Sequence, residues 1–181
     1  MTSGRAPGCP QGPGTELARV AVLLGRAPAG DFEVVRRAPD GSPQVIENAP
    51  FLRDGTPMPT RFWLVDRELR AAVSRLEAAG GVREAEAAVG AEELALAHAR
   101  YAAARDARIP AGHVGPRPSG GVGGTAAGVK CLHAHLAWWL VGGDDPVGAW
   151  VAGRLGVGPG GGAQAASGDD LSRRLRSGAS G

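Results

Sequence analysis

The order of apolar and polar positions predicts strands in the first part of the chain and helices after them. Segments 32–37 and 44–47 are rich in apolar and β-branched residues, and the turn residues of 39–43 separate them, which predicts a hairpin. Segment 61–65 is aromatic and β-branched without a Gly or Pro, so it predicts a third strand. The stretch 48–60 contains three prolines and is expected to form an ordered surface loop.

Helical spacing of apolar residues predicts the other elements. The expected helices are 15–24, one between Asp66 and Gly80, two pieces or one broken helix over 82–109 with an interruption at Gly90, 129–141, and 146–155. Asp66 and Asp145 precede two of these segments and are expected to cap them, and Pro146 suits a first helical position. Residues 110–124 are rich in Gly and Pro and have no periodicity.

This pattern predicts an α+β fold, in which a small, partly antiparallel sheet of about three strands within 32–65 packs against four to six helices. The folded part is expected to be a single domain over 15–155. The ends, 1–14 and 156–181, contain too few apolar residues to offset the entropy of ordering them, so both are predicted to be disordered.

Charge and cysteine content exclude several classes of function. The formal net charge is only +2, and no basic helix or zinc-finger spacing indicates specific nucleic-acid binding. Neither a signal peptide nor a membrane-spanning apolar run is recognisable. The two cysteines, Cys9 and Cys131, are not expected to form a disulfide, which fits a reducing compartment. We therefore expect a cytoplasmic protein without a membrane partner, and the oligomeric state is left open.

Segment 129–141 carries the residues that most resemble metal ligands. In a continuous helix Cys131 and His135 lie on one face, about 40° apart, whereas His133 lies roughly 160° from each. Cys131 with His135 would then supply two of the four ligands that zinc requires. The candidates for the other two are His113, Asp40 and Asp66. The interpretation we favour is a buried cysteine with two hydrogen-bonded histidines and no cofactor, with zinc as the alternative.

The same helix is expected to have a core face. Its apolar stripe would consist of Val129, Leu132, Leu136, Trp139 and Leu140. Trp138 shares the face of Cys131 and His135, so that face is either buried too or forms a pocket or a partner surface.

Two segments are candidates for binding an anion or a small molecule. They are the loop 51–61, with Asp54, Thr56, Thr60 and Arg61, and the expected helix start 125–135, with Lys130, His133 and His135. Residues 121–126 match the G-x-G-x-x-A spacing, but no strand precedes them, so the dinucleotide-binding mechanism is missing. No catalytic residue is expected, because a mid-helix Cys131 is poorly placed as a nucleophile and Asp144 and Asp145 are typical of capping.

Several sequence blocks resemble a bacterial family known as domain of unknown function 501. The most specific are P-F-L-R-D-G-T-P-M-P-T at 50–60 and V-K-C-L-H-A at 129–134, and the resemblance covers roughly 17–155. The resemblance implies that relatives tend to carry C-P-x-G-x-P, often with a second cysteine at the first x, where this chain has A-P-D-G-S-P at 38–43. It also implies that they can have a cysteine or histidine where Asp66 stands. The resemblance implies no activity. Genes of this family often lie near those of a septum-formation initiator and an exopolyphosphatase. The resemblance therefore suggests a link to cell division or phosphate metabolism.

Three functions therefore stay open. The first, which we favour, is a non-enzymatic interaction or accessory protein with an unknown protein partner, in which Trp138 and Trp150 contribute a surface and cell division is the context. The second is an anion-binding or small-molecule enzyme that uses 51–61 and 125–135. The third is a zinc-stabilised structural domain.

Overall fold

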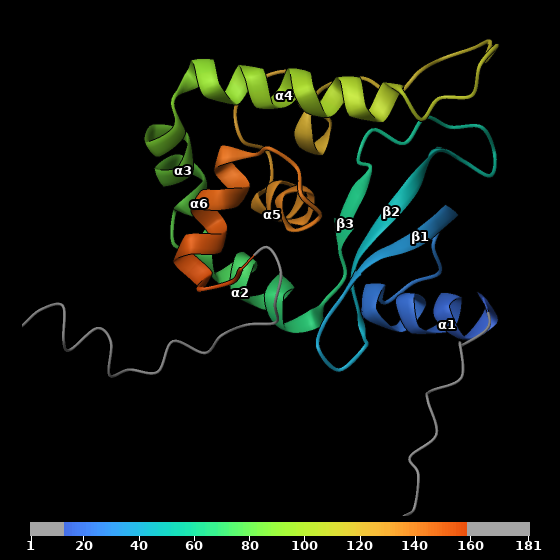
Figure 1. Ribbon diagram of the computed structural model, residues 1–181, viewed down its shortest axis with the longest axis horizontal. Coiled ribbons are helices and arrows are strands. Elements are labelled where there is room, and N and C mark those ends of the chain that lie inside the picture. The colour runs from blue at the N-terminus through green and yellow to red at the C-terminus, as the bar shows by residue number, and fades with distance from the viewer. Residues whose placement is uncertain (1–12, 159–181) are drawn as a thin grey trace, which may run out of the picture.

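The computed structural model describes residues 13–158, and it has the predicted α+β fold (Figure 1). Strands β1 (Gly30–Arg37), β2 (Pro43–Leu52) and β3 (Phe62–Leu64) form an antiparallel sheet in the order β1-β2-β3. The helices of this part are α1 (Pro13–Leu24), α2 (Arg67–Ala78), α3 (Gly81–Val89), α4 (Ala91–Asp106), the short 3₁₀ turn η1 (Val122–Gly124), α5 (Leu132–Leu140) and α6 (Pro146–Leu155). Most of the two predicted tails, 1–14 and 156–181, lies outside the described residues.

The sheet buries both of its faces, because successive side chains of a strand point to opposite sides. Phe62 and Leu64 of β3 join the main core with helices α2 to α6, whereas Trp63 packs against a second cluster on the other face. That second cluster lies under α1, which runs along the side of the sheet away from the other helices (Figure 1). The protein is thus a three-layer arrangement of α1, the sheet and the α2–α6 group.

The predicted helix boundaries hold where a local signal sets them. Asp66 Oδ1 accepts the backbone N–H of Leu69 at 2.8 Å, and Asp145 Oδ1 accepts that of Gly148 at 3.0 Å, so both aspartates cap as expected. Gly90, with φ of 82°, separates α3 from α4 in a conformation that other residues rarely adopt.

Strand β2 is longer than predicted, because residues 48–52 continue it instead of beginning the loop. Asn48 pairs with Phe32, and Leu52 pairs with Gly30 across a register irregularity. Pro50 lies within this irregular stretch, where a missing N–H interrupts fewer ladder hydrogen bonds than in a regular strand. The expected loop is therefore confined to 53–61.

Helix α5 differs most from its prediction. It begins at Leu132, and Cys131 before it has an extended backbone with φ of −159° and ψ of 118°. The helix lies at the centre of the helical layer, seen end-on in Figure 1 and surrounded by α2, α4, α6 and β3. His135 is fully buried and Trp138 is 6% exposed, so the face expected to be a possible surface is core.

Candidate functional site

A cleft of about 680 Å³ opens beside β3, an edge strand of the sheet. The end of α1, one side of α2 and the start of α5 complete its walls. Its polar lining consists of Arg26, Thr60, Arg67, Arg70, Ser74, Cys131 and His133.

Three guanidinium groups give the cleft a positive charge. Arg67 is exposed, and Arg26 lies over the ring of Trp63, 5.3 Å from its centroid. Arg70 donates to the carbonyl of Leu23 at 2.7 Å. Within residues 13–158, none of the three arginines forms an ion pair with a carboxylate. Their charge is therefore not neutralised by the described part of the chain.

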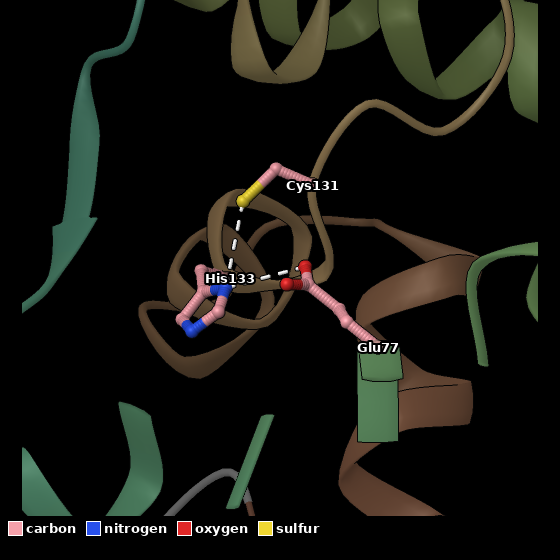
Figure 2. Close-up of side chains that lie close together, drawn as sticks. All are labelled: Glu77, Cys131 and His133. Carbon is pink, nitrogen blue, oxygen red and sulfur yellow. Dashed lines mark hydrogen bonds and ion pairs between the residues drawn. The ribbon is translucent and has the colours of Figure 1, made fainter. Parts of the chain in front are cut away.

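Cys131, His133 and Glu77 converge beside this cleft (Figure 2). The Nδ1 atom of His133 lies 3.5 Å from Cys131 Sγ and 3.2 Å from Glu77 Oε1. The side chains of His133 and Glu77 are 23% and 27% exposed, so the cluster is partly accessible. Glu77 comes from the last turn of α2, whereas Cys131 and His133 come from the start of α5.

The other ring nitrogen of His133 sets its tautomer. Nε2 lies 3.1 Å from the backbone carbonyl of Arg70 and 3.3 Å from Ser74 Oγ. A carbonyl only accepts hydrogen bonds, so Nε2 carries a proton and Nδ1 is the nitrogen that faces Cys131 and Glu77. The pKa of His133 is raised. The hydrogen bond with Cys131 is the largest cause, burial acts in the opposite direction, and electrostatic interactions with Cys131 and Glu77 and the hydrogen bond with the Arg70 carbonyl raise the pKa further.

Two glutamates from earlier helices hold the backbone before α5 in its extended form. Glu86 Oε1 accepts the N–H of Val129 at 2.6 Å, and Glu77 Oε1 accepts that of Leu132 at 2.7 Å. Cys131, the N-cap residue, makes no capping bond with its own side chain, so Glu77 supplies the acceptor that the helix start needs. This arrangement turns the thiol of Cys131 toward His133.

The expected pairing of Cys131 with His135 assumed a continuous helix through both residues, whereas Cys131 precedes α5 with an extended backbone. His135 Nδ1 instead contacts Asp145 at 2.7 Å, and neither side chain is exposed. Among the described residues, Nε2 of His135 is the buried side-chain polar atom that lacks a hydrogen-bond partner. His135 belongs to the core, and the potential metal ligands that lie together are Cys131, His133 and Glu77.

The additional ligands suggested for that pairing lie elsewhere. Asp66 caps α2, Asp40 accepts from Ser42 at 2.6 Å within its own turn, and His113 stacks on Phe51 with centroids 4.2 Å apart.

The residues predicted to bind an anion do not surround one cavity. Thr60 and His133 line the same cleft. Asp54 instead accepts the N–H of Thr56 in an exposed turn. Arg61 is paired with Glu47 at 2.9 Å. Lys130 is exposed outside the cleft lining, and His135 is buried. A role in anion binding stays a prediction for Thr60 and His133.

Helix α2 supplies most of the site residues that were not predicted. Arg67, Arg70, Ser74 and Glu77 follow one another at spacings of three, four and three residues. This spacing places them along one side of a helix and is a polar counterpart of the apolar stripe that predicted α2. The polar stripe was thus visible in the sequence. The sequence did not show that this stripe faces the start of α5.

Residues 34–153 match the family model described as Protein of unknown function (DUF501). The chain belongs to this family. The match is shorter than the 17–155 expected and begins after α1, so it leaves out three residues of the cleft, Leu23, Leu24 and Arg26. Comparison with curated proteins and with solved structures gave no match.

The positions at which DUF501 relatives were expected to carry a cysteine or a histidine line a different cleft. Ala38, Asp40 and Asp66 lie in a neighbouring depression that shares Leu23 and Arg67 with the first. None of these three positions belongs to the Glu77–Cys131–His133 group.

The described part of the structure has only short helices. Its longest helix, α4, has 16 residues, and nowhere in residues 13–158 does a helix combine the length and apolar character of a membrane span.

Proposed function

We propose that the protein binds a small oxyanion-bearing ligand, of the phosphate class, in the cleft beside β3. The observation that carries this proposal is that Arg26, Arg67 and Arg70 line one cleft without a carboxylate partner among residues 13–158. Guanidinium groups present several donors in a plane, which suits the geometry of phosphate oxygens.

The rest of the lining supports the same class of ligand. The hydroxyls of Thr60 and Ser74 are additional donors, and Trp63 offers a flat apolar wall. The volume of about 680 Å³ lies within the range of roughly 300–1,000 Å³ that is usual for small-molecule sites. A cleft that combines an apolar wall with cationic donors suits a ligand with both an organic part and an oxyanion.

This geometry favours ligand binding over the interaction protein preferred from the sequence. The interaction hypothesis depended on Trp138 and Trp150 as a surface, and Trp138 is 6% exposed. Arg154 lies over the ring of Trp150, 4.6 Å from its centroid. A cytoplasmic location remains part of the proposal, since a reducing compartment keeps Cys131 a thiol. A link to cell division has no support in the geometry.

Isothermal titration with inorganic phosphate, pyrophosphate and a nucleoside diphosphate tests the proposal. We expect saturable binding of at least one probe, and about 10- to 100-fold weaker binding for Arg67→Ala, because a charged hydrogen bond contributes about 1.5–3 kcal/mol. Arg83→Ala is the matched control, since Arg83 is an exposed arginine on α3 outside the cleft.

Tryptophan emission gives a second readout. Binding should change the fluorescence of the wild-type protein, and Trp63→Phe should remove most of that change because Trp63 is the tryptophan in the cleft lining. Absence of binding for all three probes, or equal affinity in the Arg67→Ala and Arg83→Ala variants, would overturn the proposal.

A further inference from the structure

We propose that Glu77, Cys131 and His133 form a binding site for a divalent transition metal of the zinc class, next to the oxyanion cleft. Their ligand atoms all lie within 4.8 Å of one another, and no other such group of three is present in residues 13–158 (Figure 2). The site does not depend on oxyanion binding, since all three ligands belong to the chain itself.

The way the cluster converges argues against a catalytic triad. In a triad one nitrogen of the histidine faces the nucleophile, and the other nitrogen faces the acid. Here Cys131 Sγ and Glu77 Oε1 both approach Nδ1 of His133, at 3.5 and 3.2 Å. Nε2 is bonded to the Arg70 carbonyl at 3.1 Å instead. Convergence on one nitrogen is the arrangement of ligands around a common ion.

The charges in the cluster require a positive species at its centre. With Nε2 protonated, a neutral His133 presents the lone pair of Nδ1 to the carboxylate of Glu77, which also holds only lone pairs. Such an approach is repulsive unless a proton or a metal ion lies between the two atoms. A metal ion also accounts for the thiol of Cys131, which is a weak hydrogen-bond donor but, when ionised, a strong zinc ligand.

The distances suit a tetrahedral ion. Zinc lies about 2.3 Å from thiolate sulfur and about 2.0–2.1 Å from imidazole nitrogen, so tetrahedral angles place sulfur and nitrogen roughly 3.5 Å apart and nitrogen and oxygen roughly 3.4 Å apart. The measured separations are 3.5 Å for Cys131–His133 and 3.2 Å for His133–Glu77. The donation from His133 Nε2 to a backbone carbonyl is the outer hydrogen bond that metal-binding histidines usually make.

The ligand types select the metal and leave room for a fourth donor. A thiolate with an imidazole favours zinc over magnesium or calcium, which prefer oxygen ligands. Three protein ligands with one further position are typical of zinc sites that bind a water or a small molecule. Cys131 and His133 also line the cleft, so the proposed metal site adjoins the cavity that holds the three arginines.

Metal loading of the purified full-length chain tests the site without an oxyanion. The protein is treated with a chelator, dialysed, and titrated with Zn²⁺ alone and with Co²⁺ alone. We expect one Zn²⁺ per chain by elemental analysis, and with Co²⁺ a thiolate-to-metal charge-transfer band in the near ultraviolet. Cys131→Ser and His133→Gln should bind Zn²⁺ at least about 100-fold more weakly, since even an outer-shell partner contributes 10- to 100-fold.

Cys9→Ser is the matched control, because Cys9 is the other cysteine of the chain and lies outside the described residues. It should retain the metal and the cobalt band, and circular dichroism should confirm that each variant is folded. No stoichiometric Zn²⁺ in the wild-type chain, or unchanged Zn²⁺ affinity in folded Cys131→Ser and His133→Gln, overturns the proposal and favours a proton between His133 and its neighbours. The two proposals are tested separately. If the protein binds phosphate but no Zn²⁺, the metal site is refuted and the oxyanion site is not.

Discussion

The Sγ atom of Cys131 lies 3.5 Å from Nδ1 of His133, an approach that a continuous helix through both residues does not allow. It is possible because α5 begins only at Leu132 and Cys131 is extended. Glu77 connects the two facts, since Oε1 of the same carboxylate accepts the N–H of Leu132 and contacts His133. The start of the helix and the geometry of the site therefore depend on one side chain of α2.

Glu77→Ala should destabilise the protein, because it removes the acceptor of the Leu132 N–H at the start of α5. We expect a loss of about 1–3 kcal/mol in the free energy of unfolding, measured by urea denaturation. Glu77→Gln keeps an amide oxygen at this place and should lose less. Equal stability of both variants and the wild type would show that Glu77 does not hold the helix start.

Replacement of Asp145 should be far more harmful than replacement of its neighbour Asp144. Asp145 and His135 form a fully buried pair, whereas the side chain of Asp144 is 81% exposed. Breaking a buried pair costs about 3–5 kcal/mol, and an exposed pair contributes at most about 1 kcal/mol. Thermal unfolding of Asp145→Ala and Asp144→Ala should therefore differ by many degrees. Similar melting temperatures would contradict the buried pairing.

Two glycines of α6 should respond in opposite directions to the same change. A Cβ atom at Gly148 would lie 2.4 Å from the Cβ of Trp139 and 2.5 Å from the backbone oxygen of His135, whereas at Gly153 it would meet nothing within 4 Å. Gly148→Ala should lower the free energy of unfolding by about 1–3 kcal/mol or more, because the obstruction includes backbone. Gly153→Ala should raise it by about 0.5–1 kcal/mol. Chemical denaturation measures both changes. If the free energy of unfolding changed in the same direction in both variants, the packing of α6 on α5 would be refuted.

His98 should make the protein less stable in acid. Burial, the largest cause, lowers the pKa of His98 in the folded protein, and an unfolded histidine titrates near 6.5. As the pH falls through 6.5, the unfolded chain therefore binds a proton at this position before the folded chain does. The free energy of unfolding should then decrease by up to about 1.4 kcal/mol per pH unit.

His133 has a raised pKa and acts in the opposite sense, so the effect of His98 is isolated by comparison with a variant. In His98→Asn, an amide oxygen can replace Nδ1 as the acceptor of the Val122 N–H. Urea denaturation between pH 5 and 7.5 should show a smaller loss of stability on acidification for this variant. Parallel pH profiles would mean that the folded protein protonates His98 as readily as the unfolded chain does.

The sequence predicted those parts of the fold that short-range signals control. Asp66 and Asp145 cap helices because their acceptors lie three residues from the N–H groups they bind, and Gly90 separates two helices through its own φ angle. Short runs of β-branched and aromatic residues likewise predicted the three strands. The start of α5 was not predictable in this way, since Val129 and Leu132 donate to Glu86 and Glu77, which lie 43 and 55 residues earlier in the chain.

The same long-range contacts explain why the candidate site groups other side chains than the sequence suggested. An unbroken helical wheel paired Cys131 with His135, but the extended backbone of Cys131 brings it to His133 instead. The polar stripe of α2 was visible in the sequence, yet its orientation toward α5 follows from packing of the core. Sequence reasoning therefore singled out this segment but grouped its side chains differently from the structure.

Anomalous X-ray scattering from zinc-loaded crystals tests the metal site most directly. We expect one peak at the zinc absorption edge, about 2.0–2.3 Å from Glu77 Oε1, Cys131 Sγ and His133 Nδ1. Data collected below the edge should lack this peak. A zinc peak on other residues, or crystals that take up zinc without a peak among these three atoms, would contradict the account.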